Sequence, residues 1–226
     1  MTINRPFYSG ENIDLVVPLE QHVWESSWPY WLNDELTTRF TTHGLMPNSP
    51  AKQKKFFDSL TEDSRFALLI TAPSGQVPIG VVSLSGIDFR SGRCAVAIIM
   101  DLKTEVTHSP LASLEAMAFV TSHAFEVLGL RRIDAGQVYP DNERWRKSLQ
   151  LLGYRAEGIK REAFKRGNVV KDEVLLGCTL KTYLEIKESR DGHFWPGNSL
   201  ITKALSQLPA QSIAQQLDKF LRSIEV

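Results

Sequence analysis

Cysteine is scarce in this sequence, and net charge is absent. The chain of 226 residues has two cysteines, Cys94 and Cys178, each within an apolar run and without the spacing of metal ligands. We expect two buried, unpaired thiols, as is typical of a reducing cytoplasm. The 26 basic and 26 acidic residues cancel, so no global field attracts nucleic acid or an anionic membrane. A small neutral or mixed-charge ligand is favoured.

Long apolar runs and the common nucleotide and metal motifs are also missing. No run reaches membrane-span length, and the N-terminal residues have no signal-peptide core, so the sequence disfavours membrane anchoring and export. No phosphate-binding P-loop, pair of metal-spaced histidines or nucleophile elbow occurs. The sequence therefore predicts no metal site, no nucleic-acid partner and a cytoplasmic protein.

Hydrophobic periodicity and turn residues predict an alternation of strands and helices. Three consecutive strands are expected to form an antiparallel meander. The helix that follows them is expected to begin at Ser109–Pro110 and to end at Gly129. The expected elements are a strand (11–19), short helices broken at Pro29 (20–40), a helix after a Ser49 cap, three strands (between 65 and 102), a helix (109–130), a strand (131–139), a helix (141–152) and two strands (154–164 and 169–180).

The C-terminal part of the sequence has a different character. Residues 186–198 are polar and rich in turn residues, which indicates a boundary. Residues 199–226 have the pattern of two short amphipathic helices split at Pro209. We expect an α/β domain over residues 1–185, followed by a linker and helical extension over 186–226 that packs either as a lid or as a homodimer contact.

Three stretches in this element order resemble the GNAT superfamily of acyl-CoA-dependent N-acetyltransferases. They are YWLNDELTTRF (30–40), PIGVVSLSGIDFRSGR (78–93) and the DN…LGYRAEGIKRE pattern (141–162). The similarity covers roughly residues 10–183 and is nearest the branch that holds ribosomal-protein and aminosugar N-acetyltransferases. It implies an α/β fold whose mixed, mostly antiparallel sheet is splayed in the middle and flanked by helices. It also implies acetyl-CoA as co-substrate.

The resemblance implies a donor site in that splay. The pantetheine arm would bond free backbone groups around Ile99, Met100 and Leu102, because a strand edge satisfies amides without needing particular side chains. Asn142 would hold the arm near the sheet opening. Alternatively, Asp141 or Asn142 caps the following helix, which both residue types do well.

The pyrophosphate would meet the start of the helix expected over 109–130. There the family places a Gly-rich loop, but this chain has KTEVTHSPLAS (103–113), which contains no Gly and includes Pro110 without an N–H. Arg144, Arg146 and Lys147 lie near the presumed cofactor end and could meet phosphates, or they could be ordinary solvated charges. The candidate donor contacts in these two regions are Ser109, Leu111, Ala112, Trp145 and Arg146.

The resemblance also indicates which catalytic side chains are replaced. Many members carry a Tyr seven residues after the Asn, and the ribosomal-protein branch carries a Ser three residues after it. Here these positions are Leu149 and Trp145, and the Glu of related aminosugar enzymes corresponds to Ala95. Tyr139 or Tyr154 could replace the acid, or each could pack as a strand-end aromatic. The candidate general bases are Asp88, His43, His108 and Asp101.

These features predict an N-acetyltransferase that moves an acetyl group from acetyl-CoA to a primary amine by direct attack. The acceptor would be a small molecule such as an aminosugar, or a protein N-terminus. A missing acid or base slows such a reaction by about 10²–10⁴-fold without abolishing it, because alignment of the reactants remains. The alternative is a non-catalytic binding or scaffold module that keeps the fold and has lost the usual pyrophosphate loop.

Overall fold

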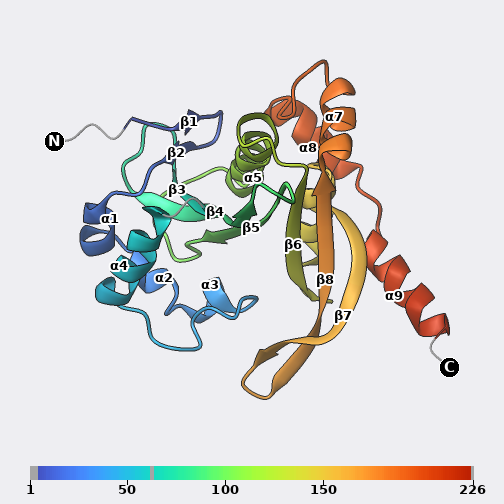
Figure 1. Cartoon of the computed structure of the whole chain (residues 1–226), viewed down its shortest axis with the longest axis horizontal. Coiled ribbons are helices and arrows are strands. Elements are labelled where there is room, and N and C mark those ends of the chain that lie inside the picture. The colour runs from blue at the N-terminus through green and yellow to red at the C-terminus, as the bar shows by residue number, and fades with distance from the viewer. Residues whose placement is uncertain (1–4, 62–63, 225–226) are drawn as a thin grey trace.

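The computed structural model describes residues 5–61 and 64–224, and Figure 1 labels its elements. The strands are β1 (Tyr8–Ser9), β2 (Asp14–Val16), β3 (Arg65–Thr71), β4 (Pro78–Asp88), β5 (Arg93–Met100), β6 (Arg132–Tyr139), β7 (Arg155–Arg166) and β8 (Val169–Thr179). The helices are α1 (Glu20–Glu25), α2 (Trp28–Trp31), α3 (Glu35–Thr38), α4 (Pro50–Asp58), η1 (Ser59–Thr61), α5 (Ala112–Ser122), η2 (His123–Val127), α6 (Glu143–Gln150), α7 (Leu180–Glu188), α8 (Asn198–Ser206) and α9 (Ile213–Ile224).

In the described part of the chain the strands form one sheet in the order β1-β2-β3-β4-β5-β6-β8-β7. Neighbouring strands are antiparallel except β5 and β6, which run parallel. The expected mixed, mostly antiparallel sheet flanked by helices is therefore confirmed. The expected meander is confirmed as well, since β3, β4 and β5 pair in sequence order.

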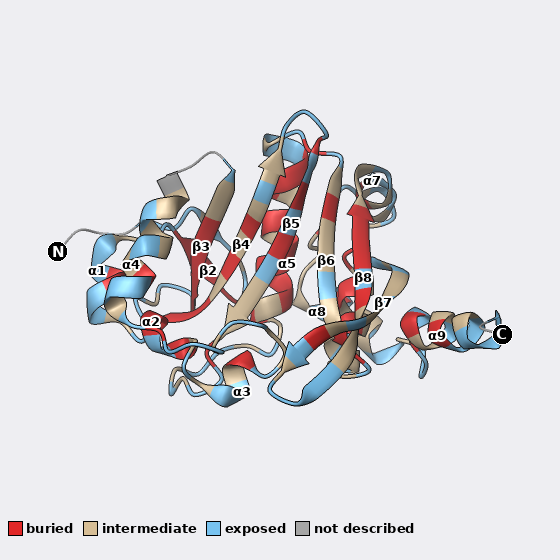
Figure 2. Ribbon diagram, turned by 60° about the horizontal axis from the view of Figure 1, so that its bottom comes forward, coloured by how far each residue is buried: buried red, intermediate tan, exposed pale blue. Residues whose placement is uncertain are grey.

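The sheet is buried on both faces near β3, because alternate residues of a strand point to opposite sides. Leu68 and Ile70 belong to the main hydrophobic core with α5. Leu69, between them, packs instead with Trp28 and Trp31 in a second cluster under the N-terminal helices. Figure 2 shows the buried residues concentrated in the central strands and in α5, while exposed residues lie on the outer helices, in the loops and along the β7–β8 hairpin.

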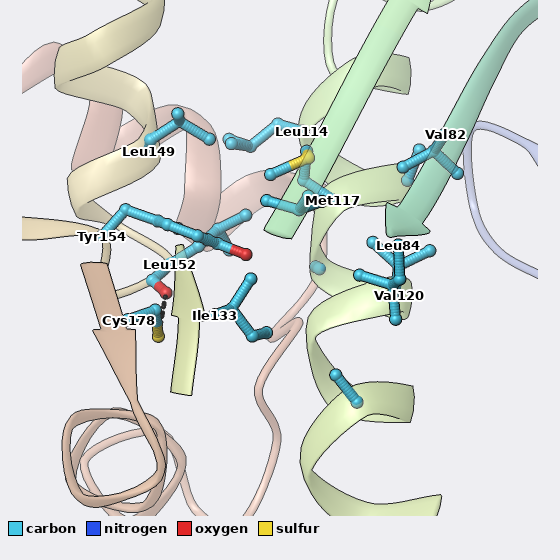
Figure 3. Close-up of a cluster of buried hydrophobic side chains, with 14 of the residues drawn as sticks. Val82, Leu84, Leu114, Met117, Val120, Ile133, Leu149, Leu152, Tyr154 and Cys178 are labelled. Carbon is cyan, nitrogen blue, oxygen red and sulfur yellow. Dashed lines mark hydrogen bonds between the residues drawn. The ribbon is translucent and has the colours of Figure 1, made fainter. Parts of the chain in front are cut away.

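Figure 3 shows the part of the main core where α5 meets α6 and the C-terminal strands. Tyr154 is fully buried there, and its hydroxyl lies 2.8 Å from Oγ1 of Thr121 on α5. Both cysteines are free and buried, which confirms the expectation of two unpaired thiols. Burial raises the pKa of each thiol to about 12, so neither Cys94 nor Cys178 is a thiolate near neutral pH.

Helix α5 begins later than the sequence pattern predicts. Leu111 is the N-cap and Ala112 the first helical residue, while Ser109 accepts a hydrogen bond from the Leu111 N–H in the preceding turn. The helix then continues as a π-helical turn, His123–Val127. Gly129 follows this turn with a φ of 65°, a conformation that glycine adopts without steric cost, as expected for a helix end.

Helix α7 was not among the expected elements. Strand β8 ends at Thr179, one residue before the expected end. The Thr179 hydroxyl accepts a hydrogen bond from the Thr182 N–H and so caps α7. The expected domain boundary at residue 185 lies within this helix. Beyond it, Phe194 and Ile201 are buried in the main core, so the C-terminal residues pack against the domain.

We predict that two buried histidines make stability depend on pH. His22 accepts a hydrogen bond from the Leu19 N–H at 2.9 Å, and His123 stacks on Phe66 with ring centroids 4.9 Å apart. Burial lowers the pKa of both imidazoles below the ordinary 6.5. The unfolded chain therefore binds protons more readily, and the stabilising contribution is complete above pH 6.5 and lost as pH falls below it.

Urea denaturation checks this expectation. The urea concentration at the unfolding midpoint should decrease as pH is lowered from about 7.5 to about 5.5. This interval lies above the range in which most carboxylates titrate. His123→Phe should reduce this pH dependence. A midpoint that is constant over the interval would contradict the prediction.

Candidate active site

Strands β5 and β6 pair only at Arg93–Ala95 and Arg132–Asp134. β5 continues along β4 as far as Met100, and β6 continues along β8 as far as Tyr139. The two strands therefore diverge, as Figure 2 shows. Beyond Ala95, the backbone groups on the edge of β5 that faces away from β4 have no strand partner among the described residues.

A cavity of about 550 Å³ occupies this splay. Its walls come from β5, β6, α5, α6, the segment around α3 and the hairpin of β7 and β8. Several residues that the sequence suggested as site residues converge here. They are His43, Ile99, Met100, Leu102, Asn142 and Trp145.

Asn142 occupies the N-cap position of α6 without capping it. Its backbone is left-handed, with φ 60° and ψ 26°, and its side chain makes no cap hydrogen bond. Asp141, the alternative cap, forms an ion pair with Lys171 instead. Asn142 therefore lines the cavity, and its side-chain amide has no hydrogen-bond partner in the described part of the chain.

The N-terminus of α5 also reaches the cavity, but with different amides from those expected. The N–H groups of Leu111 and Ala112 donate to Ser109, at 3.1 and 3.0 Å. The next two N–H groups, those of Ser113 and Leu114, make no hydrogen bond to the described part of the chain, and Ser113 lines the cavity. Open donors at a helix N-terminus suit an anion.

Gln137 is a lining residue that the sequence analysis missed. Its Oε1 atom is buried and has no hydrogen-bond partner among the described residues. A buried acceptor normally has a partner, so this oxygen is suited to an N–H of a bound molecule. The unpaired edge of β5, Asn142 and Gln137 together fit an arm that carries amide groups.

Glu173 is a second lining residue that the sequence analysis missed. It lies on β8, directly opposite Val138 of β6. The available signal was a run of polar residues, Lys171–Glu173, inside an otherwise apolar strand. That run does not indicate which of its members faces a cavity.

Tyr139 and Arg146 are not among the lining residues. The Tyr139 hydroxyl donates to Oδ2 of Asp218 on α9 at 3.2 Å, and burial is the main cause of its raised pKa. The Arg146 guanidinium lies 5.4 Å from the Tyr139 ring centroid and donates to the carbonyl oxygens of Val138 and Pro140. Their suggested roles as acid and phosphate contact stay predictions.

Asp88 lies in the hairpin between β4 and β5, at the end where β5 still pairs with β6. It accepts hydrogen bonds from the Ser91 hydroxyl at 2.6 Å and from the Arg90 N–H at 2.9 Å. These bonds, that from Ser91 foremost, lower the pKa of its carboxyl group. The cavity lining does not include Asp88, Asp101 or His108.

The loop that contains His43 forms the wall of the cavity opposite α5 and α6. Arg166, near the tip of the β7–β8 hairpin, donates to the carbonyl oxygens of Thr38, Thr41 and His43 at 2.7, 3.4 and 3.3 Å. Figure 1 shows this hairpin extending beside α3. The Arg166 guanidinium thus connects the β7–β8 hairpin to the loop that contains His43.

The two positions at which family members carry an acid also line the cavity. They hold Trp145 and Leu149, four residues apart on one face of α6. In Figure 3 the Leu149 side chain extends from α6 toward α5, on which Met117 lies. The cavity therefore has an apolar surface where a hydroxyl would supply a proton.

Within residues 5–61 and 64–224, no group of three or more His, Cys, Asp or Glu side chains is arranged to hold a metal ion. None of the helices in these ranges combines the length and apolar character needed to cross a membrane.

The comparison with protein families identifies the class. The sequence model described as the acetyltransferase (GNAT) domain matches residues 16–155, which is more than half of the chain. The protein belongs to the GNAT acetyltransferase family. It is accordingly an acetyltransferase of the GNAT type, with acetyl-CoA as its acyl donor. No curated protein matched the chain.

Solved structures share the fold at low sequence identity. Spermidine N-acetyltransferase from Vibrio cholerae, in complex with CoA and spermine, is 13% identical with a TM-score of 0.67, over 77% of this chain and 99% of that one. RimJ from Mycobacterium smegmatis, in complex with CoA-disulfide, is 14% identical with a TM-score of 0.65, over 79% and 89%. The microcin C7 self-immunity acetyltransferase MccE, in complex with acetyl-CoA and AMP, is 15% identical with a TM-score of 0.63, over 76% and 94%.

Proposed function

We propose that the protein transfers the acetyl group of acetyl-CoA to a primary amine. The amine is carried by a small molecule such as an aminosugar, or by a protein N-terminus. The observation that carries the proposal is the cavity at the splay, where the open edge of β5 meets the uncommitted amides of Asn142 and Gln137. The similar enzyme from Vibrio cholerae, a spermidine N-acetyltransferase, supports a small amine as acceptor.

The donor would lie along β5. The amide groups of its pantetheine arm would bond the strand edge, Asn142 and Gln137. Its pyrophosphate would meet the free N–H groups of Ser113 and Leu114 at the start of α5, where the helix dipole favours negative charge. These amides lie two residues after the expected donors Leu111 and Ala112.

The reaction requires alignment more than proton transfer by the protein. The acceptor nitrogen attacks the thioester carbonyl carbon, so that a C–N bond forms and the C–S bond breaks. The electron pair of that bond leaves with the sulfur, which takes a proton from water, while the nitrogen gives its proton to water. Trp145 and Leu149 line the cavity at the family's acid positions and supply no proton. The cavity then acts by holding both substrates in contact.

Two measurements test this function. CoA should raise the melting temperature in a concentration-dependent way, because a ligand that binds only the folded state stabilises it. Acetyl-CoA with a panel of primary amines should then release free thiol. Absence of a thermal shift at millimolar CoA would favour the alternative, a binding or scaffold module without a donor site.

We predict that Asn142→Gly weakens CoA binding by about 3- to 10-fold, the worth of one neutral hydrogen bond. Glycine suits the left-handed backbone at this position, so the substitution removes the amide without straining the start of α6. Calorimetric titration measures the dissociation constant. Asn168→Gly, in the exposed turn between β7 and β8, is the matched control and should leave CoA affinity unchanged. Equal affinities for all three proteins would remove Asn142 from the donor site.

A further inference from the structure

The carboxylate of Glu173 lies across β6 because residue 136 is glycine. A Cβ atom built at Gly136 would overlap Oε1 of Glu173. Both residues line the cavity. They share one face of the sheet, since Glu173 pairs with Val138 and alternate residues of β6 point the same way. Any side chain at position 136 would push this carboxylate out of its place.

Glu173 is the only acidic residue in the described lining of the cavity, and Arg39 is the only Lys or Arg there. Within the described residues its carboxylate has no hydrogen bond and no ion pair. Lys160 lies opposite Glu173 on β7, yet its exposed side chain forms no ion pair with it. A partly buried carboxylate beside apolar walls is costly without a cationic partner.

The position of Glu173 separates it from the donor contacts. Gln137 and Tyr139 lie on the face of β6 that meets α6 and α9, because Tyr139 contacts both Arg146 and Asp218. Glu173 therefore lies on the opposite face. The loop around His43 and the β7–β8 hairpin also line the cavity, and we assign the acceptor to this side of it.

We propose that Glu173 recognises the acceptor by binding its ammonium group, so that the enzyme prefers alkylamines, which are protonated at neutral pH, over uncharged arylamines. This inference rests on the proposed function. Glu173 holds the cation by a charge-assisted hydrogen bond from the ammonium N–H to its carboxylate. The ammonium proton passes to water before the nitrogen attacks.

The first test compares kinetic constants for two classes of acceptor. Glu173→Gln should raise KM for alkylamines by about 10- to 100-fold, the worth of one charge-assisted hydrogen bond. KM for acetyl-CoA and kcat/KM for an arylamine should stay within about two-fold, since neither substrate presents a cation to position 173. Glu188→Gln, an exposed glutamate on α7, is the control for loss of one negative charge.

The second test leaves Glu173 unchanged and displaces its carboxylate from the cavity. Gly136→Ala should raise KM for alkylamines much as Glu173→Gln does, because the new methyl group displaces the carboxylate. The double variant should then be no worse than either single variant, whereas independent effects would multiply.

The outcomes separate the two proposals. Acetylation of amines with an unchanged alkylamine KM in Glu173→Gln would overturn the role of Glu173 and leave the proposed function standing. An equal loss for alkylamines and arylamines would also overturn it, because a merely structural role does not distinguish charge. A wild-type protein that binds acetyl-CoA and acetylates no amine would overturn both.

Discussion

A Glu115→Leu variant is expected to lose about 3–5 kcal/mol of the free energy of unfolding. Glu115 is fully buried on α5, and its carboxylate accepts three hydrogen bonds of 2.8 Å, from the Glu11 N–H, the Asn12 N–H and the Asn12 side-chain amide. Removing the carboxylate leaves the two backbone N–H groups without a partner, each costing about 1–3 kcal/mol before relaxation, while the Asn12 side-chain amide keeps its hydrogen bond to Oδ1 of Asn198. Leucine is a good helix former, so helix propensity does not account for the loss.

Chemical denaturation measures the change, and Glu188→Leu on the exposed face of α7 is the control. Glu115→Gln should fall between the wild type and Glu115→Leu, because its amide keeps one carbonyl acceptor but turns an NH₂ group toward the donors. Amide exchange at residues 11 and 12 should rise most, since these residues lose their partner directly. A loss below about 1 kcal/mol would mean that water replaces the carboxylate at little cost.

An Arg146→Met variant is expected to lose a similar amount, about 3–5 kcal/mol, as is usual when one member of a buried charged network is removed. The Arg146 side chain is 1% exposed and forms an ion pair of 2.7 Å with Glu143. It also donates to the carbonyl oxygens of Val138 and Pro140, which join the end of β6 to the start of α6. Methionine keeps the unbranched apolar part of the side chain and none of these donors.

Arg144→Met is the matched control, because Arg144 is exposed on the same helix. Its stability should stay within about 0.5 kcal/mol of the wild type. CoA titration well below the melting temperature then tests the suggested phosphate contact of Arg146. A stable Arg146→Met protein with much weaker CoA binding would assign Arg146 to the donor site and contradict the structural role.

The sequence could point to some residues that line the cavity because their pattern is local. Asn142 was suggested by its place after a strand and its spacing to Gly153, and the apolar residues Trp145 and Leu149 follow from the same spacing. Their roles stay predictions. Arg146 could not be assigned in this way. One position along a helix is a rotation of about 100°, which turns Arg146 away from the cavity face that Trp145 and Leu149 share. Only its packing reveals the carbonyl oxygens that it binds.

Glu173 and Gln137 could not be predicted because their roles depend on pairing between distant segments. Glu173 reaches the cavity only because β8 pairs with β6 in a register that places it beside Gly136, and because that residue has no side chain. The side-chain oxygen of Gln137 has no hydrogen-bond partner among the described residues because β5 and β6 separate before they reach this position. Neither fact is encoded in the periodicity of the segment that contains the residue.

The sequence by itself determined the kinds of elements and most of their order, since apolar periodicity, Ser and Thr caps and glycine ends act over a few residues. It also determined the family resemblance, and with it the splayed sheet and acetyl-CoA. The tertiary structure alone decided which amides at the start of α5 remain free, that neither Asp141 nor Asn142 caps α6 with its side chain, and which acidic residue enters the cavity. These outcomes depend on hydrogen bonds and strand registers between segments far apart in the chain, and such contacts exist only after the chain has folded.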